Sequence, residues 1–319
     1  MSLIVSNLSK KYGDKTVLQS LSFEMQTPGV YALLGTNGAG KTTAIRMMLG
    51  MLSRDSGEVL WNGAPLDTAT CNVGYLAEER GLYPKYNLMD QLIYFARLRG
   101  VSTPEAKRRI AYWAERLEVE EYLYPTKAVR SMGKVIQKQV SSKRADQLSK
   151  GNQQKIQFMT ALLPDPELII LDEPLSGLDP VNTDLFKSII REEINKGKYL
   201  IMSSHQMATV EEFCSDITIL DRSRVILQGH LNDIKKSYGR VNLSLKVERD
   251  ISEQIERAGV TLVSEKEFEY DLKVSGEEQA NALLGALIAD GVTIVKFDLR
   301  EPSLHEIFVE KVGDANEKN

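Results

Sequence analysis

The stretch Gly35-Thr36-Asn37-Gly38-Ala39-Gly40-Lys41-Thr42 fits the pattern G-x-x-x-x-G-K-[ST], and the chain around it supports the match. Residues 30–34 before it indicate a short apolar strand, and residues 43–49 after it indicate the start of a helix. Glycines let such a loop adopt positive φ angles and turn its N–H groups toward one anion, to which the helix adds the positive end of its dipole. The stretch therefore predicts a phosphate cradle, in which Lys41 reaches the β and γ phosphates and the Thr42 hydroxyl binds Mg²⁺.

Two acids follow a second apolar run. Leu168 to Leu171 indicates a buried parallel strand, and Asp172 and Glu173 come directly after it, at the strand end where ligands bind in open α/β sheets. Asp172 could hold Mg²⁺ through water, and Glu173 could orient or deprotonate a water that attacks the γ-phosphate. The alternative is that the two acids only cap the following helix.

The composition is that of a globular protein of 319 residues, with 42% hydrophobic and 26% charged residues and a formal net charge of −4. The length suggests about two domains, and no excess of positive charge marks a nucleic-acid binder, so no nucleic-acid partner is expected. Cys71 and Cys214 are far apart in sequence, which favours a reducing compartment over a disulfide framework. No signal peptide is evident and no run approaches the ~20 apolar residues that span a bilayer, so any membrane role must come through a partner chain.

Short apolar runs separated by turn residues predict the strands of the first domain. Residues 3–26 indicate an antiparallel layer, in which Tyr12 either stacks on a nucleotide base or only covers apolar surface. Residues 58–61 and the Asn62-Gly63 turn indicate a hairpin. Further strands are expected at 73–76, 199–203, 217–220 and 224–228, and a helix at 180–196.

From the charged loop that begins at Glu78 to about Gln147 the pattern turns helical. Within this region, the stretch from Lys127 to Arg144 contains six basic residues and no acid. Such a run is either a solvated face or a docking surface for an acidic partner or for lipid head groups.

Beyond Gly229 the order of predicted elements is β-α-β-β-α-β, over residues 241–299, followed by a helix at 303–312. This is the order of a small α+β ferredoxin-like domain. It contains no catalytic constellation, and we expect a structural, dimerising or regulatory role. The predicted domains are therefore 1–230, with a helical subdomain at about 79–160, and 231–319.

Together these motifs resemble the ATP-binding subunit of an ABC transporter. The resemblance covers about residues 1–230 and is carried by residues 35–43, 148–155, 168–174, 176–179 and 204–205, whose order and spacing agree with that family. It implies a P-loop NTPase fold of the ABC ATPase type, with a RecA-like core, an antiparallel β layer and a helical subdomain, and it implies ATP and Mg²⁺ as cofactors.

The resemblance also implies a mechanism. Two ATP-binding subunits, alike or related, pair head to tail, and ATP lies between the phosphate loop of one and the signature segment of the other, here Leu148 to Gln153. The pair energises a separate transmembrane permease at the cytoplasmic face of the membrane. By this resemblance Lys41, Glu173 and His205 are catalytic, Glu173 being the base and His205 contacting the γ-phosphate. The nucleotide would contact Tyr12, Gly35, Asn37, Gly38, Ala39, Gly40, Lys41, Thr42 and Thr43, together with Ser149, Gly151 and Asn152 from the partner and Asp179, which communicates across the dimer.

The chain departs from the commonest family pattern at a few positions. Glu78 stands where glutamine is usual, and Lys150 and Asn152 replace the first glycine and the glutamine of the signature. Glu78 is expected near the metal, beside Thr42 and Asp172, where its charge either tightens metal binding or weakens nucleotide binding. These variants and the segment 301–308 resemble a bacterial exporter subgroup that includes sodium-extrusion and antibiotic-efflux subunits. The basic stretch between Tyr124 and Leu148 is longer than is typical and is expected near the surface that meets the permease.

Other classes fit the sequence less well. A soluble ABC ATPase acting on ribosomes or DNA usually has two cassettes or a long coiled coil, and this chain has one phosphate loop. A binding-only module is disfavoured by the intact Lys41, Asp172, Glu173 and His205. A GTPase is disfavoured because Asn195-Lys196-Gly197-Lys198 lacks the acid of the N-K-x-D pattern.

Overall fold

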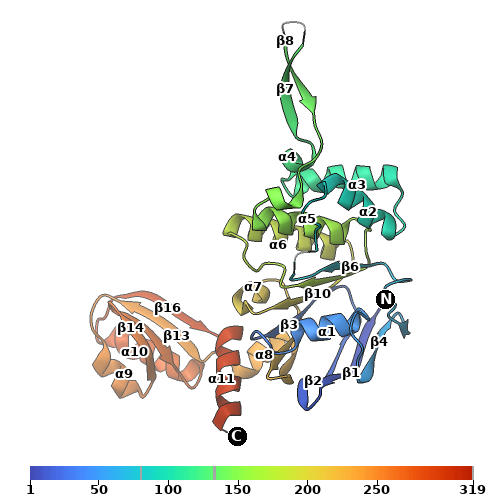
Figure 1. The fold of residues 1–319 in the computed structure, drawn as a ribbon. Coiled ribbons are helices and arrows are strands. Elements are labelled where there is room, and N and C mark those ends of the chain that lie inside the picture. Colours follow the sequence, from blue (N-terminus) through green and yellow to red (C-terminus); the bar gives the residue numbers. More distant parts are fainter. Residues whose placement is uncertain (80, 132–133, 318–319) are drawn as a thin grey trace. The chain divides into compact units, whose positions relative to one another are not determined.

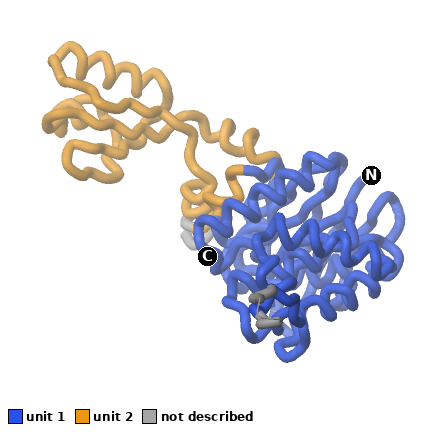
Figure 2. Tube along the Cα trace, turned by 90° about the horizontal axis from the view of Figure 1, so that it is seen from above, with its two compact units in different colours: residues 1–206, 213–228 blue, residues 207–212, 229–319 orange. Residues whose placement is uncertain are grey.

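A computed structural model describes residues 1–79, 81–131 and 134–317 of the chain. The chain divides into two compact units (Figure 2). Unit 1 comprises residues 1–206 and 213–228, and unit 2 comprises residues 207–212 and 229–319.

The centre of unit 1 is a six-stranded sheet whose strands run in the order β12-β11-β3-β10-β9-β6. Neighbouring strands from β11 to β6 are parallel, and residues 30–34 of β3 and 168–172 of β9 are entirely buried, as expected for apolar runs covered on both faces. The parallel strands end at a common edge, where Gly35, Asp172 and Ser204 lie. The bounds are β3 Gly29–Gly35, β6 Val73–Leu76, β9 Leu168–Asp172, β10 Tyr199–Ser204, β11 Asp216–Asp221 and β12 Arg224–His230.

The predicted antiparallel layer is confirmed as a second sheet, with strand order β2-β1-β4-β5. Helix α1 (Lys41–Met48) buries Ile45 and Met47 in one apolar cluster that contains Leu3 and Val5 of this layer and Leu33 of the central sheet. The helix that follows the phosphate loop is therefore fixed by packing against both sheets. The strands are β1 Leu3–Tyr12, β2 Lys15–Met25, β4 Ser56–Trp61 and β5 Ala64–Pro65.

A helical subdomain occupies residues 88–162 of unit 1, and it contains α2 Leu88–Leu98, α3 Thr103–Arg116, α4 Glu120–Leu123, a 3-10 turn at Ala145–Gln147 and α5 Lys150–Leu162 (Figure 1). The expectation of helix throughout this region is wrong at one place. Strands β7 (Thr126–Ser131) and β8 (Lys134–Gln139) form an antiparallel hairpin there. The sequence explains the difference, since Thr126, Val129, Val135 and Ile136 give these stretches β-branched residues without the apolar spacing of a helix. After this subdomain, α6 (Pro180–Asn195) follows β9.

Unit 2 has the predicted ferredoxin-like order of elements. Its four-stranded sheet runs β14-β15-β13-β16 with antiparallel neighbours, the arrangement that two β-α-β crossovers produce. Leu245 and Tyr270 on one face of the sheet pack against Ile255 and Leu283 of the two crossover helices. The bounds are α7 Met207–Glu211, α8 Leu231–Tyr238, β13 Asn242–Val247, α9 Ser252–Ala258, β14 Thr261–Lys266, β15 Glu269–Lys273, α10 Glu277–Ala289, β16 Ile294–Arg300 and α11 Leu304–Glu317.

Candidate nucleotide site

The phosphate loop joins the end of β3 to the start of α1 in a backbone conformation that requires glycine at two positions. Gly40 has a φ of 110°, and a Cβ atom on it would lie 2.6 Å from the carbonyl oxygen of Val17. A Cβ atom on Gly35 would lie 2.2 Å from the carbonyl oxygen of Leu220. No side chain caps the N-terminus of α1, so its first N–H groups remain available to an anion.

A cavity of about 450 Å³ opens beside this loop. It brings together eight of the residues that the sequence singled out: Asn37, Gly38, Gly40, Lys41, Thr42, Thr43, Glu78 and Glu173. Five further residues line it that the sequence did not indicate: Lys15, Val17, Arg46, Glu79 and Ser223. Lys15 and Val17 come from β2, and Ser223 from the turn between β11 and β12, so only the tertiary pairing of distant segments places them here. Gly35, Asp172 and His205 do not line the cavity but contact Lys41, Thr42 and Glu173, respectively. Ala39 is also absent from the lining, although it stands between Gly38 and Gly40 in the sequence.

Lys41 and Glu173 form a buried ion pair in the cavity wall. Lys41 Nζ lies 3.2 Å from Glu173 Oε1, and the two side chains are 6% and 5% exposed. Lys41 also donates a hydrogen bond of 2.8 Å to the carbonyl oxygen of Gly35. On its other side, Glu173 Oε2 lies 2.9 Å from Nδ1 of His205. A phosphate that approached Lys41 would therefore compete with the Glu173 carboxylate for the same ammonium group.

Asp172 lies behind Thr42 and is almost completely enclosed. Its Oδ1 accepts hydrogen bonds from Thr42 Oγ1 at 3.3 Å and from Ser203 Oγ at 2.5 Å. Burial raises the pKa of Asp172, and the hydrogen bonds from Ser203 and Thr42 oppose that shift. Its Oδ2 is buried and has no hydrogen-bond partner among residues 1–79, 81–131 and 134–317.

These groups fit a magnesium ion. Mg²⁺ is usually held by one or two carboxylates, several waters and the phosphates of the substrate rather than by a complete protein cage. Thr42 and Asp172 supply a hydroxyl and a carboxylate side by side, and the unpartnered Oδ2 is a free acceptor for a water of the ion. In the part of the chain that the structure describes, no group of three or more His, Cys, Asp or Glu side chains forms a complete metal site.

Tyr12 is not among the residues that line the cavity. It ends β1 with 53% of its surface exposed, and Nζ of Lys10 lies 5.4 Å from the centre of its ring. Its predicted stacking on adenine stays a prediction.

The signature segment also lies outside the cavity of its own chain. Ser149 caps α5, where its Oγ accepts a hydrogen bond of 3.3 Å from the backbone N–H of Asn152. The Asn152 amide donates to the hydroxyl of Tyr122 at 2.9 Å, and Gly151 lies near Leu178, which precedes the cap of α6. Asp179 caps α6 by accepting from the N–H of Asn182 at 3.0 Å, and this backbone hydrogen bond lowers the pKa of Asp179. The segment is thus fixed in place without contributing to the site of its own molecule.

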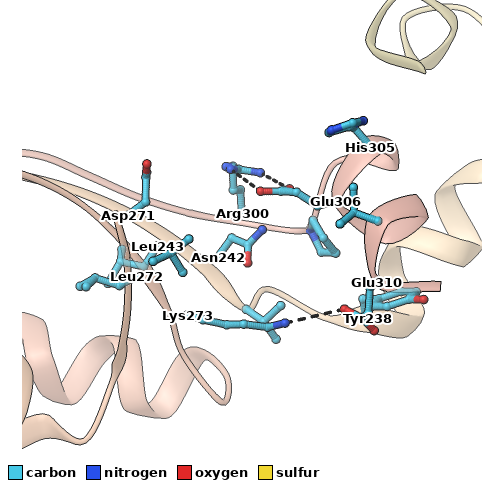
Figure 3. Close-up of a pocket in the computed structure, with 14 residues that line it drawn as sticks. Tyr238, Asn242, Leu243, Asp271, Leu272, Lys273, Arg300, His305, Glu306 and Glu310 are labelled. Atoms are coloured by element: carbon cyan, nitrogen blue, oxygen red, sulfur yellow. Dashed lines mark hydrogen bonds and ion pairs between the residues drawn. The ribbon is translucent and has the colours of Figure 1, made fainter. Parts of the chain in front are cut away.

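A second, larger cavity of about 590 Å³ lies within unit 2, between the sheet and α11 (Figure 3). Four of its charged residues form two pairs, because Arg300 pairs with Glu306 at 2.9 Å and Lys273 lies 3.7 Å from Glu310. It contains none of the residues that the sequence assigned to chemistry. Lys41, Thr42 and Glu173, which the sequence assigned to chemistry, line the cavity at the phosphate loop instead.

Comparison with known families matches both parts of the chain. The family model described as "ABC transporter" matches residues 18–176. The model described as "ATP-binding protein DrrA1-3-like, C-terminal domain" matches residues 229–312.

Individual relatives extend over almost the whole length. The chain is 40% identical to the uncharacterized ABC transporter ATP-binding protein YhaQ of Bacillus subtilis, over 99% of this chain and 100% of that protein. It is 28% identical to the Nod factor export ATP-binding protein I of Rhizobium etli, over 98% of this chain and 94% of that protein. A solved structure described as the ATP binding subunit of an ABC transporter superposes with a TM-score of 0.64 and 29% identity, covering 75% of this chain and 93% of the other.

Proposed function

Because this chain belongs to the ATP-binding proteins of ABC transporters, we propose that it hydrolyses ATP and thereby drives a separate transmembrane permease. The comparisons confirm the resemblance to ABC transporter ATP-binding subunits, the ABC ATPase fold and the extra C-terminal domain, which matches the DrrA1-3-like family model. The observation that carries the proposal is the convergence of Lys41, Thr42, Asp172 and Glu173 at the carboxyl edge of the parallel sheet.

In the proposed reaction, Glu173 accepts the proton of the water that attacks the γ-phosphate. Its backbone N–H donates to Ser203 Oγ at 2.9 Å, and His205 holds one carboxylate oxygen, so the base is oriented from two sides. Lys41 turns from Glu173 to the phosphates when ATP enters. Thr42 and Asp172 would hold Mg²⁺, which when bound would offset the negative charge of the phosphates.

The second half of each site comes from another ATP-binding subunit. We infer that Ser149, Gly151 and Asn152 at the start of α5 cover the γ-phosphate bound to the partner, because the N-terminus of a helix attracts anions. Their absence from the cavity of their own chain supports this reading. Asp179 then lies at the dimer surface, and Tyr12 stacks on the adenine of the nucleotide bound by its own phosphate loop.

A patch of exposed aromatic and apolar side chains on α2 and on the loop before it is our candidate surface for the permease. This tyrosine patch consists of Tyr83, Tyr86, Tyr94 and Leu98, each at least 51% exposed. Large aromatic side chains are enriched at the centres of protein interfaces, where their apolar bodies become buried.

The loop between Glu78 and Tyr86 connects the tyrosine patch to the cavity. Glu78 lines the cavity at one end of this loop. At the other end, the buried Gln91 of α2 fastens the loop by accepting from the N–H of Tyr83 at 2.7 Å and donating to the carbonyl oxygen of Tyr86 at 2.9 Å. A movement of Glu78 on nucleotide binding would therefore reach the permease through a loop that is fixed to α2.

The direction of transport is proposed from the relatives. The Rhizobium etli relative is named for Nod factor export, and we infer that this chain also serves an exporter, of an ion, a drug or a peptide, at the cytoplasmic face of the membrane. Within the described residues no helix has both the length and the apolar character to cross a bilayer.

The substitution Glu173→Gln tests the reaction. It should lower the turnover of ATP by about 10²- to 10⁴-fold, the range that a general base contributes, while nucleotide binding persists. The measurements are phosphate release and the binding of a fluorescent ATP analogue. Glu167→Gln is the matched control, because Glu167 is exposed and directly precedes the same strand. Turnover at the level of the unsubstituted chain in Glu173→Gln would remove Glu173 from its role.

A further inference from the structure

The hairpin of β7 and β8 is a two-stranded sheet that pairs with no other strand in the described part of the chain. Figure 1 shows it extending away from the helices α2, α3 and α4. A hairpin of two strands is only marginally stable in water when nothing packs against it. A surface partner would therefore add to its stability.

Two lysines face each other across this hairpin. Lys127 of β7 is directly opposite Lys138 of β8, so both side chains leave the same face of the ribbon, and both are exposed. Like charges at such positions destabilise a strand pair. Because no acid occurs between residues 127 and 144, the neighbouring sequence supplies no carboxylate to offset them. A phosphate group from another molecule would relieve the repulsion by binding between the two ammonium groups.

The base of the hairpin is firmly attached to the helical subdomain. The N–H of Val140 donates to Pro125 O at 2.9 Å, and the N–H of Lys143 donates to Tyr122 O at 2.8 Å. The carbonyl oxygen of Lys143 accepts from the N–H of Leu88, the first residue of α2, at 2.9 Å. Tyr86 of the tyrosine patch is two residues before Leu88 in the sequence, so the base of the hairpin joins α2 next to the surface that we assign to the permease.

We propose that Lys127 and Lys138 bind the phosphate groups of anionic phospholipids at the membrane surface beside the permease. The cytoplasmic leaflet is negatively charged and attracts clusters of lysine and arginine next to a membrane protein. Lys143, whose Nζ lies 4.7 Å from the centre of the Tyr122 ring, adds a further positive charge at the base of the hairpin. The position of the membrane rests on the proposed function, but the binding of lipid can be measured without a permease.

The test is cosedimentation of the full chain with vesicles of phosphatidylcholine alone or of phosphatidylcholine with phosphatidylglycerol. We expect binding only to the anionic vesicles, and weaker binding at high salt because screening shortens the reach of the charges. The double variant Lys127→Glu/Lys138→Glu should lower the partition coefficient by at least about tenfold, since each basic residue near an anionic surface contributes about fivefold. The conservative variant Lys127→Arg/Lys138→Arg should retain binding.

The matched control is Lys107→Glu/Lys236→Glu, which makes the same change in net charge at two exposed lysines elsewhere. It should keep most of the binding, and circular dichroism checks that every variant is folded. Equal binding to both kinds of vesicle, or equal binding by Lys127→Glu/Lys138→Glu and its control, would overturn the proposal.

The outcome separates this inference from the proposed function. If no vesicle is bound but the double charge reversal releases the chain from a copurifying permease in detergent, the hairpin binds an acidic protein surface and the lipid proposal is wrong. If anionic vesicles are bound as expected but the chain releases no phosphate from ATP, the lipid proposal stands and the ATPase proposal fails.

Discussion

In the proposed magnesium site Asp172 would act as a charged carboxylate, although it is only 1% exposed. Burial raises the pKa of Asp172 in the folded chain above its pKa in the unfolded chain. The contribution of this group to the stability of the nucleotide-free chain therefore falls as the pH rises from the pKa of the unfolded state through that of the folded state. We expect Asp172→Asn to raise the free energy of unfolding of the nucleotide-free chain at pH 7 by on the order of 1 kcal/mol. The gain should shrink toward pH 4, where the carboxyl group is increasingly protonated in both states. Urea unfolding at a series of pH values measures it.

Asp172→Asn should also lose the magnesium dependence of nucleotide binding, because a neutral amide binds the water molecules of the hydrated ion more weakly than a carboxylate does. Asp14→Asn is the control, since Asp14 is exposed and its replacement should change stability by less than about 0.5 kcal/mol. If Asp172→Asn is less stable than the unsubstituted chain at pH 7, the hydrogen bonds from Thr42 and Ser203 outweigh the burial of the charge.

For single residues, the sequence identifies those that belong to a local motif better than it identifies the other residues that line the same cavity. Lys41, Thr42, Asp172 and Glu173 could be identified because each belongs to a local pattern next to an apolar strand. Lys15 and Ser223, which line the same cavity, have no such pattern. They reach the site because β2 belongs to the antiparallel layer and the β11–β12 turn lies beside it, as the bond from the N–H of Gln19 to the carbonyl oxygen of Ser223 at 2.8 Å shows. Such long-range contacts are a property of the fold.

Among the elements, α11 is tied by its first turn to the end of β16 through the side chain of Glu306. Glu306 receives two hydrogen bonds from Arg300, at 2.9 and 3.1 Å, and one from the N–H of Ser303 at 2.6 Å. Burial raises the pKa of Glu306, but the hydrogen bonds from Arg300 and Ser303 outweigh it and lower the pKa to about 2. The group therefore adds stability above its unfolded pKa, and this stability is lost as the pH falls toward 2.

We expect Glu306→Gln to weaken the attachment of α11 by about 1 kcal/mol at pH 7. The loss is no larger because both partners are about 40% exposed, so that water screens their attraction. Hydrogen exchange of the amides at 304–312 measures the loss, and the variant and the unsubstituted chain should converge near pH 2. Glu310→Gln is the control in the same helix, since its contact with Lys273 is longer, at 3.7 Å. Equal exchange in the two variants would show that the Arg300 pair does not hold the helix.

The helices and strands of the chain could be predicted where apolar residues recur with one clear spacing, that of a helix or that of a strand. The parallel strands, α6 and the ferredoxin-like order of unit 2 follow from apolar runs bounded by turn residues. The hairpin at 126–139 was not predictable in this way. Its basic residues interrupt the alternation of apolar and polar residues that indicates a strand, and β7 and β8 pair with each other rather than with one of the larger sheets. Without such an alternation the sequence specifies neither the strands nor their register.

For the whole molecule, the decisive question is whether a site is completed by a second copy. Two variants separate the halves of a site: Lys41→Ala removes the phosphate contact of a chain but leaves its signature segment, and Ser149→Glu places a negative charge at the signature but leaves the phosphate loop. Each variant alone should be nearly inactive in a head-to-tail pair, because every site then contains one damaged half.

Mixing the two variants should restore activity if the sites form in trans. In a mixed pair, the phosphate loop of the Ser149→Glu chain meets the intact signature of the Lys41→Ala chain, so one site is whole and the other carries both defects. Random pairing makes half of the pairs mixed, so phosphate release should rise to about one quarter of that of the unsubstituted chain if the sites turn over independently. Occlusion of one labelled nucleotide per mixed pair provides a second readout, which does not depend on turnover. If the mixture releases no more phosphate and occludes no more nucleotide than the two variants do separately, Ser149 does not complete the partner's site.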